Sequence, residues 1–115
     1  MLQKAIDATI EGHFAAMRAT PTAANEGQVA GAFEGAVRAQ GARFLGYDTI
    51  AGAGNDACIL HYPFADAPLQ PGSLVLMDAG AEIGYYTADI TRTWPWSSFI
   101  HLPCRWRPRK ALAIR

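Results

Sequence analysis

The stretch "LVLMDAGAEIGYYTADITRTWP", residues 74–95, reads as two consecutive strands, and the rest of the fold is interpreted from it. Its first part is a compact apolar run. Its second part is rich in β-branched and aromatic residues, which favour strands. Each part carries one aspartate, Asp78 in the first and Asp89 in the second. A carboxylate in a buried strand needs a compensating partner, so the stretch predicts a hairpin whose two carboxylates require an explanation.

The expected hairpin turn sets how these aspartates face each other. A two-residue turn at Ile83 and Gly84 would place Asp78 directly opposite Asp89. Directly opposed residues share a face, with β-carbons about 4.5–5.5 Å apart, and like charges there repel. A cation would remove the repulsion, and the two ions of hydrolytic metal centres lie about 3.5–4 Å apart. A second interpretation stays open, in which each aspartate is a separate residue that bonds local backbone N–H groups.

The first forty residues predict two helices, because their apolar residues recur at helical spacing. In the first helix, Ile6, Ile10, Phe14 and Met17 form an apolar stripe along one face. Asn25, with Gln28 three residues later, is expected to cap a second helix that stops near Gly41. The order of helix, helix and then strands predicts an α+β fold, with two N-terminal helices packed on a mostly antiparallel sheet.

Composition indicates a globular chain in a reducing compartment. The sequence has 115 residues, of which 50% are hydrophobic and 17% are charged, as in one globular domain. No apolar run is long enough to span a bilayer, and the N-terminus lacks an apolar signal core. The two cysteines show no disulfide framework. We therefore expect a cytoplasmic protein that has no membrane partner.

Three blocks of the sequence, taken together and in this order, resemble the catalytic domain of the aminopeptidase P (Xaa-Pro aminopeptidase) family. They are "GYDTIAGAGNDACILHY", "GSLVLMDAG" and "YYTADITRTWP". The similarity covers residues 1–99, which we therefore interpret as a partial metallopeptidase catalytic domain. It implies a truncated pita-bread (creatinase/aminopeptidase) fold. It also implies hydrolysis of an N-terminal Xaa-Pro peptide bond, so that the partner would be a peptide with proline at its second position.

The same resemblance implies roles for individual residues. Asp78 and Asp89 match the first two ligands of a centre of two divalent metal ions, usually manganese, and hard carboxylate oxygens suit that metal. His61 matches a histidine beside the scissile bond that assists substrate binding and catalysis, although composition alone is also compatible with a core histidine. Tyr47 matches a position near the site, where we expect it to pack and to hydrogen-bond a ligand carboxylate. We interpret His13 as structural.

The ligands that follow the second aspartate in the family have no counterpart here. The family uses a histidine and two glutamates, but no acid follows Asp89, and the only later histidine is His101. His101 is too close to Asp89 in sequence to match the third ligand. We therefore expect an incomplete metal site and a chain that is inactive alone. The uncovered sheet of such a half would favour a homo-oligomer.

Residues 100–115 differ sharply in composition from the rest of the chain. Residues 101–115 hold five of the ten bases and no acid, and their prolines would break the helix expected there. We interpret 100–115 as a divergent basic tail that a shifted reading frame would explain. A solvated basic end and a nucleic-acid patch are the alternatives. We expect no nucleic-acid partner.

The alternative function is that of a catalytically dead pita-bread-fold homologue acting as a peptide- or protein-binding module. Such a protein would keep the cleft and lose the metal. The presence of both aspartates argues against it, because a cleft without metal has no need of opposed carboxylates.

Overall fold

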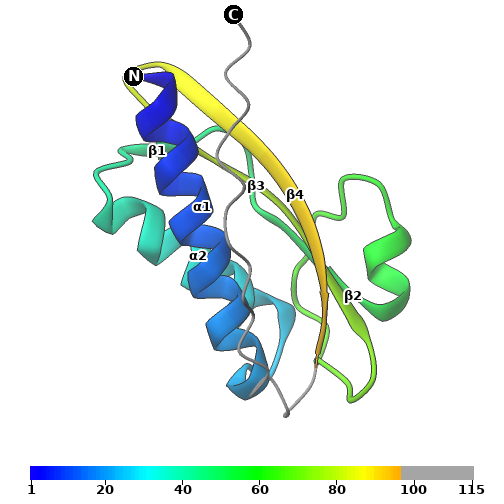
Figure 1. The fold of residues 1–115 in the computed structure, drawn as a ribbon. Helices are drawn as coiled ribbons and strands as arrows, with labels where there is room; N and C mark the ends of the chain where they lie inside the picture. Colours follow the sequence, from blue (N-terminus) through cyan, green and yellow to red (C-terminus); the bar gives the residue numbers. More distant parts are fainter. Residues whose placement is uncertain (97–115) are drawn as a thin grey trace, which may run out of the picture.

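The structure, a computed structural model, describes residues 1–96 and places two helices on one face of a four-stranded antiparallel sheet (Figure 1). The helices are α1 (Leu2–Ala19) and α2 (Glu26–Ala39), with the short 3-10 helices η1 (Thr20–Thr22) and η2 (Gly54–Cys58). The strands are β1 (Phe44–Leu45), β2 (Ile50–Ala53), β3 (Leu74–Ile83) and β4 (Tyr86–Pro95). The predicted α+β class is confirmed. No helix within these residues is long and apolar enough to cross a membrane.

Strand β3 is the centre of the sheet. Strand β4 pairs with β3 along its whole length, from Leu74 opposite Pro95 to Ile83 opposite Tyr86. Strands β1 and β2 pair with the other edge of β3. The side chains of β3 alternate between the two faces, and those buried beneath the helices are Val75, Met77, Ala79 and Ala81. The intervening residues of β3 lie on the face that the helices leave free.

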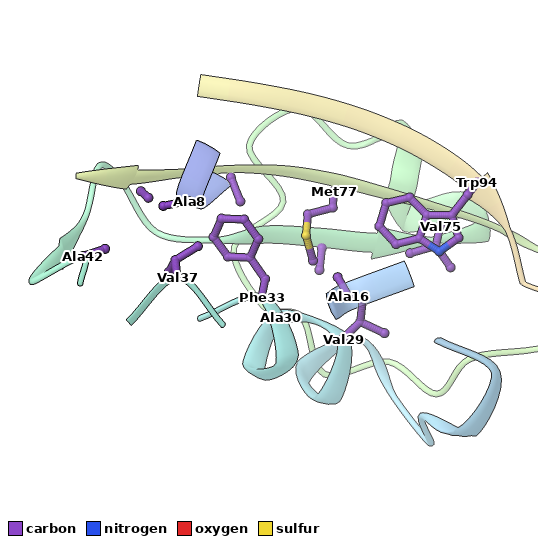
Figure 2. Packing of buried hydrophobic residues seen from close by; sticks show 13 residues of the cluster. Ala8, Ala16, Val29, Ala30, Phe33, Val37, Ala42, Val75, Met77 and Trp94 are labelled. Carbon is purple, nitrogen blue, oxygen red and sulfur yellow. The ribbon is translucent and has the colours of Figure 1, made fainter. Parts of the chain in front are cut away.

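The hydrophobic core fills the space between the helices and the sheet (Figure 2). Phe33 of α2 and Met77 of β3 are fully buried and lie close together in this view. The indole N–H of Trp94 donates to the Thr20 hydroxyl at 3.0 Å. This bond ties the end of β4 to the connection between the helices.

Helix α1 turns a face of small residues toward the core. The predicted helix is confirmed, and its apolar stripe, Ile6, Ile10, Phe14 and Met17, is partly buried. The buried positions are instead Ala5, Ala8, Thr9, Gly12, His13 and Ala16. A β-carbon at Gly12 would lie 2.6 Å from side-chain atoms of Phe33 and Val37. Glycine at position 12 therefore lets α1 approach the Phe33 and Val37 side chains of α2, where even one added carbon would collide.

Helix α2 begins and ends where the sequence predicts. The Asn25 side chain accepts a hydrogen bond from the Gln28 N–H at 3.0 Å. The Gln28 side chain accepts in turn from the Ala24 N–H at 2.8 Å. The helix ends at Ala39, and Gly41 has the positive φ of +92° that a chain leaving a helix often needs. The predicted divergent tail, 100–115, lies outside the described residues and stays a prediction.

Candidate functional site

The hairpin of β3 and β4 turns one residue later than expected. Its two turn residues are Gly84 and Tyr85, with φ values of +60° and +67°. Positive φ at both central positions is what a type I′ turn requires, and the twist of that turn suits two paired strands. Tyr85 is an uncommon residue for this conformation. The predicted turn at Ile83–Gly84 is therefore wrong, and every pairing in the hairpin shifts by two residues.

The corrected register changes the relation between the two aspartates. Asp78 lies opposite Thr91, and Asp89 lies opposite Gly80. Because Gly80 follows Asp78 by two residues, both aspartates still share the sheet face away from the helices. They are diagonal neighbours on paired strands, so their α-carbons lie about 7–8 Å apart through space. The shared face was predicted correctly, whereas the direct opposition was not.

Tyr47 fills the space between the two carboxylates. Its hydroxyl lies 2.5 Å from Oδ1 of Asp78 and 2.9 Å from Oδ1 of Asp89. Burial, followed by the hydrogen bonds to Asp78 and Asp89, raises the pKa of Tyr47, so the phenol keeps its proton at neutral pH. The expected hydrogen bond from Tyr47 to a carboxylate is confirmed, and it reaches both.

Two glycines make room for this arrangement. A β-carbon on Gly80 would collide with the carbonyl oxygen of Ala88 and would lie 3.3 Å from the Tyr47 ring. A β-carbon on Gly46 would collide with the Thr87 side chain. The Gly46 N–H also donates to the Gly80 carbonyl at 2.8 Å. The segment that carries Tyr47 can therefore lie directly against the hairpin.

The oxygen donors at the site suit a hard cation, although only a few of them are present. A phenol has one proton and can donate to one carboxylate at a time, so the other carboxylate faces an oxygen lone pair. A divalent cation would satisfy these converging oxygens, and carboxylates are the ligands that hard metals prefer. Within residues 1–96, no group of three or more His, Cys, Asp or Glu side chains could hold a metal. The described residues thus supply two carboxylates toward such a site.

His61 lies in the same cavity as the two aspartates. The cavity has a volume of about 380 Å³, and the candidate site residues Tyr47, His61, Asp78 and Asp89 all line it. His61 is exposed and has a φ of +53°, in the left-handed region that non-glycine residues seldom adopt. The alternative of a core histidine does not describe this exposed side chain.

Helix α1 supports the hairpin from the opposite face. His13 is buried, and its Nε2 lies 2.9 Å from the Ile90 carbonyl oxygen, so Nε2 must carry the proton. Burial lowers the pKa of His13, which favours the neutral ring. The Thr9 hydroxyl accepts from the Ala81 N–H at 2.9 Å and lies 3.3 Å from the Ala88 carbonyl oxygen. The structural interpretation of His13 agrees with these contacts, whereas no sequence pattern signalled Thr9.

Comparison with known proteins points to peptidases. A family model for metallopeptidase family M24 matches residues 1–102. The Xaa-Pro aminopeptidase of Haemophilus influenzae is 41% identical over 95 residues, which is 83% of this chain and 22% of that protein. The Xaa-Pro aminopeptidase of Escherichia coli is 38% identical over 95 residues, with the same two shares. The chain therefore spans about a fifth of the length of these relatives.

Solved structures agree with the sequence relatives. Aminopeptidase P from Escherichia coli, in its low-pH form, aligns with a TM-score of 0.81 at 38% identity, over 84% of this chain and 22% of that one. Aminopeptidase PepP of Pseudomonas aeruginosa aligns with a TM-score of 0.73 at 36% identity and the same coverage. The likeness confirms the predicted pita-bread fold for the aligned residues. Other structures of the Escherichia coli protein contain the inhibitor Pro-Leu, or zinc with a product.

Proposed function

Because the chain belongs to metallopeptidase family M24, we propose that it is part of a dinuclear-metal aminopeptidase that hydrolyses the N-terminal Xaa-Pro peptide bond. The observation that carries the proposal is the position of Asp78 and Asp89 on one sheet face, both against the Tyr47 hydroxyl. The names of the relatives support the peptide-bond specificity. The Pro-Leu complex of the Escherichia coli protein supports a proline-containing substrate.

Asp78 and Asp89 would hold the metal ions, for which we propose manganese. Hard carboxylate oxygens suit that ion, although the same oxygens also accept zinc. When bound, the metal pair would supply a water nucleophile that is active at neutral pH, and it would polarise the scissile carbonyl. Tyr47 keeps its proton and donates a hydrogen bond to a carboxylate, which fixes the orientation of that ligand.

His61 would bind the substrate beside the scissile bond. Its ring is exposed in the cavity that the two aspartates also line. A neutral imidazole has one N–H donor and one nitrogen acceptor, so it can hold a peptide group from either side. A cavity of about 380 Å³ is within the size range of small-ligand sites, roughly 300–1,000 Å³.

The described residues alone would not support turnover. Two carboxylates leave several coordination positions of each ion to water, and no third metal-binding side chain joins them within residues 1–96. We therefore expect weak metal binding and no measurable hydrolysis of Xaa-Pro peptides by this chain on its own. Hydrolysis at a rate typical of enzymes, about 1–10³ s⁻¹, would contradict this expectation.

Manganese titration tests the metal site directly. The full chain, an Asp78→Asn, Asp89→Asn double variant and a control variant would each be titrated and followed by electron paramagnetic resonance of free Mn²⁺. The control, Asp7→Asn with Glu11→Gln, removes two exposed carboxylates of α1 and changes the net charge equally. We expect the site variant to lose binding and the control to retain it.

The competing function makes a different prediction. A catalytically dead homologue would bind peptides through the same cavity without metal. Equal manganese affinity in the wild-type chain and the site variant, together with peptide binding that survives a chelator, would overturn the proposed metallopeptidase and favour the binding module.

A further inference from the structure

A fully buried carboxylate lies outside the proposed metal site. Glu26 is the first residue of α2, and its side chain is 0% exposed. A charged group in the protein interior persists only when hydrogen bonds or a partner compensate for its lost hydration. The N-terminal end of a helix carries partial positive charge and offsets part of that cost. The rest of the compensation comes from the loop that carries His61.

The Glu26 carboxylate joins both ends of this loop, residues 53–67. Its Oε1 accepts a hydrogen bond from the Ala53 N–H at 2.7 Å, and its Oε2 accepts from the Ala67 N–H at 3.2 Å. The Glu26 N–H also donates to the Ala67 carbonyl at 3.0 Å. Ala53 is the last residue of β2. One side chain therefore closes the loop at its base, where the loop leaves the sheet.

In the middle of the loop, the Tyr62 side chain is buried near the same carboxylate. The Tyr62 side chain is only 5% exposed. Burial raises the pKa of the Tyr62 phenol, and the nearby Glu26 carboxylate raises it further. The preceding residue, His61, is exposed and adopts a φ of +53°. The two consecutive side chains both line the cavity, but Tyr62 is buried near Glu26 whereas His61 is exposed to solvent.

We propose that Glu26 is a positioning residue that holds loop 53–67 by its base and its middle, so that His61 stays beside Asp78 and Asp89. The inference rests on the proposed function, because the position of His61 matters only if His61 contacts the substrate. The contacts between Glu26 and loop 53–67 lie within residues 1–96, so they can be tested without metal.

The first test is amide hydrogen exchange of the full chain by NMR, without metal, on the wild type, Glu26→Gln and Glu34→Gln. Glu34 lies on the same helix and is partly exposed, so its variant is a matched control. Glutamine offers one acceptor oxygen where glutamate offers two. We expect at least one of the Ala53 and Ala67 amides to exchange about tenfold faster, or more, in Glu26→Gln. The ring resonances of His61 should shift in this variant, whereas amides within α1 should keep their protection.

Two results would overturn the proposal. One is unchanged exchange of the loop amides and unchanged His61 resonances in Glu26→Gln. The other is an equal loss of protection in the loop and in α1, which would show that Glu26 stabilises the whole fold rather than the loop. If Glu26→Gln fails to fold, Tyr62→Phe removes only the phenol hydroxyl near Glu26 and keeps the ring. That variant should shift the His61 resonances, and unchanged resonances would also overturn the proposal.

Added Mn²⁺ separates this inference from the proposed function. Mn²⁺ bound at the aspartates broadens nearby NMR signals, so the amide of Asp78 and the ring of His61 should broaden in the wild type. In Glu26→Gln, broadening at Asp78 should remain while broadening at His61 decreases. If the Asp78 amide does not broaden in any variant, the proposed metal site is wrong. The metal-free exchange experiment then still decides whether Glu26 holds the loop.

Discussion

Asp78 and Asp89 are diagonal neighbours on one face of the β3–β4 hairpin, and neither lies opposite the other. The diagonal leaves a gap that the Tyr47 hydroxyl fills, 2.5 Å from the first carboxylate and 2.9 Å from the second. Gly80, opposite Asp89, has no side chain to obstruct the Tyr47 ring. The register of the hairpin thus determines that one phenol connects both carboxylates.

Replacing Tyr47 with phenylalanine should lower the thermal unfolding midpoint of the metal-free chain more than that of the metal-bound chain. Tyr47→Phe keeps the ring but removes the proton donor, so the two carboxylates lose a hydrogen bond worth about 1.5–3 kcal/mol. Thermal unfolding at neutral pH, followed by circular dichroism, should show a lower midpoint for the variant. Added Mn²⁺ should raise the midpoint of the variant more than that of the wild type. An equal increase in both would show that the phenol does not offset the carboxylate charge.

Alanine at Gly80 should destabilise the hairpin by about 1–3 kcal/mol, the usual cost of overpacking. The new β-carbon would collide with the Ala88 carbonyl oxygen, which is backbone and cannot rotate away. Gly31→Ala is the matched control, because a β-carbon at Gly31 in α2 meets nothing within 4 Å. The control should be more stable than the wild type by about 0.5–1 kcal/mol. Urea denaturation measures the unfolding free energy of both variants. Similar changes in the two would contradict the close approach of Gly80 to the Ala88 carbonyl.

Valine at Thr9 should cost about 1–3 kcal/mol of unfolding free energy, because the buried Ala81 N–H would lose its acceptor. Valine has nearly the same shape as threonine, so packing should be preserved. Thr22→Val is the control, since the Thr22 hydroxyl makes an exposed hydrogen bond. The unfolding free energy of Thr22→Val should stay within about 0.5 kcal/mol of the wild type. Urea denaturation provides the comparison. Equal losses in the two variants would exclude a special role for Thr9.

The stability of the chain should depend on pH through His13. Burial lowers the pKa of folded His13 below the ordinary value, about 6.5. Below about pH 6.5 the unfolded chain therefore binds a proton that the folded chain does not bind. Neutral His13 therefore stabilises the folded chain fully above about pH 6.5. This stabilisation is lost as the pH falls through the lowered pKa of folded His13. In His13→Gln, the amide can still donate to the Ile90 carbonyl, but it does not titrate.

Urea denaturation at several pH values between about 5 and 7 checks this prediction. The unfolding free energy of the wild type should fall more steeply with decreasing pH than that of His13→Gln. Parallel curves would show that His13 does not contribute to the pH dependence in this range.

Local features of the sequence predicted much of this molecule. The caps of α2, the existence of the β3–β4 hairpin and the shared face of the two aspartates follow from spacing and residue type. These features depend on neighbours within a few residues, so a pattern can reveal them. The three motif blocks also predicted the family and the cavity residue His61, because their order along the chain is distinctive.

Long-range contacts account for what the sequence did not reveal. The core face of α1 depends on how closely Gly12 approaches Phe33, and that distance is set by the packing of two helices. The buried charge of Glu26 has partners on β2 and in the loop far along the chain. Neither partner lies near Glu26 in sequence, so no local pattern marks either contact.

The residue types at the site were present in the sequence from the start, because a carboxylate, a phenol and an imidazole carry their chemistry wherever they lie. Their arrangement was decided by the tertiary structure. The left-handed turn at Gly84 and Tyr85 shifted the hairpin register, and the packing of the Tyr47 segment on Gly80 then placed one hydroxyl between two acids. A register is a property of two strands and their turn together, so only the folded hairpin could determine it.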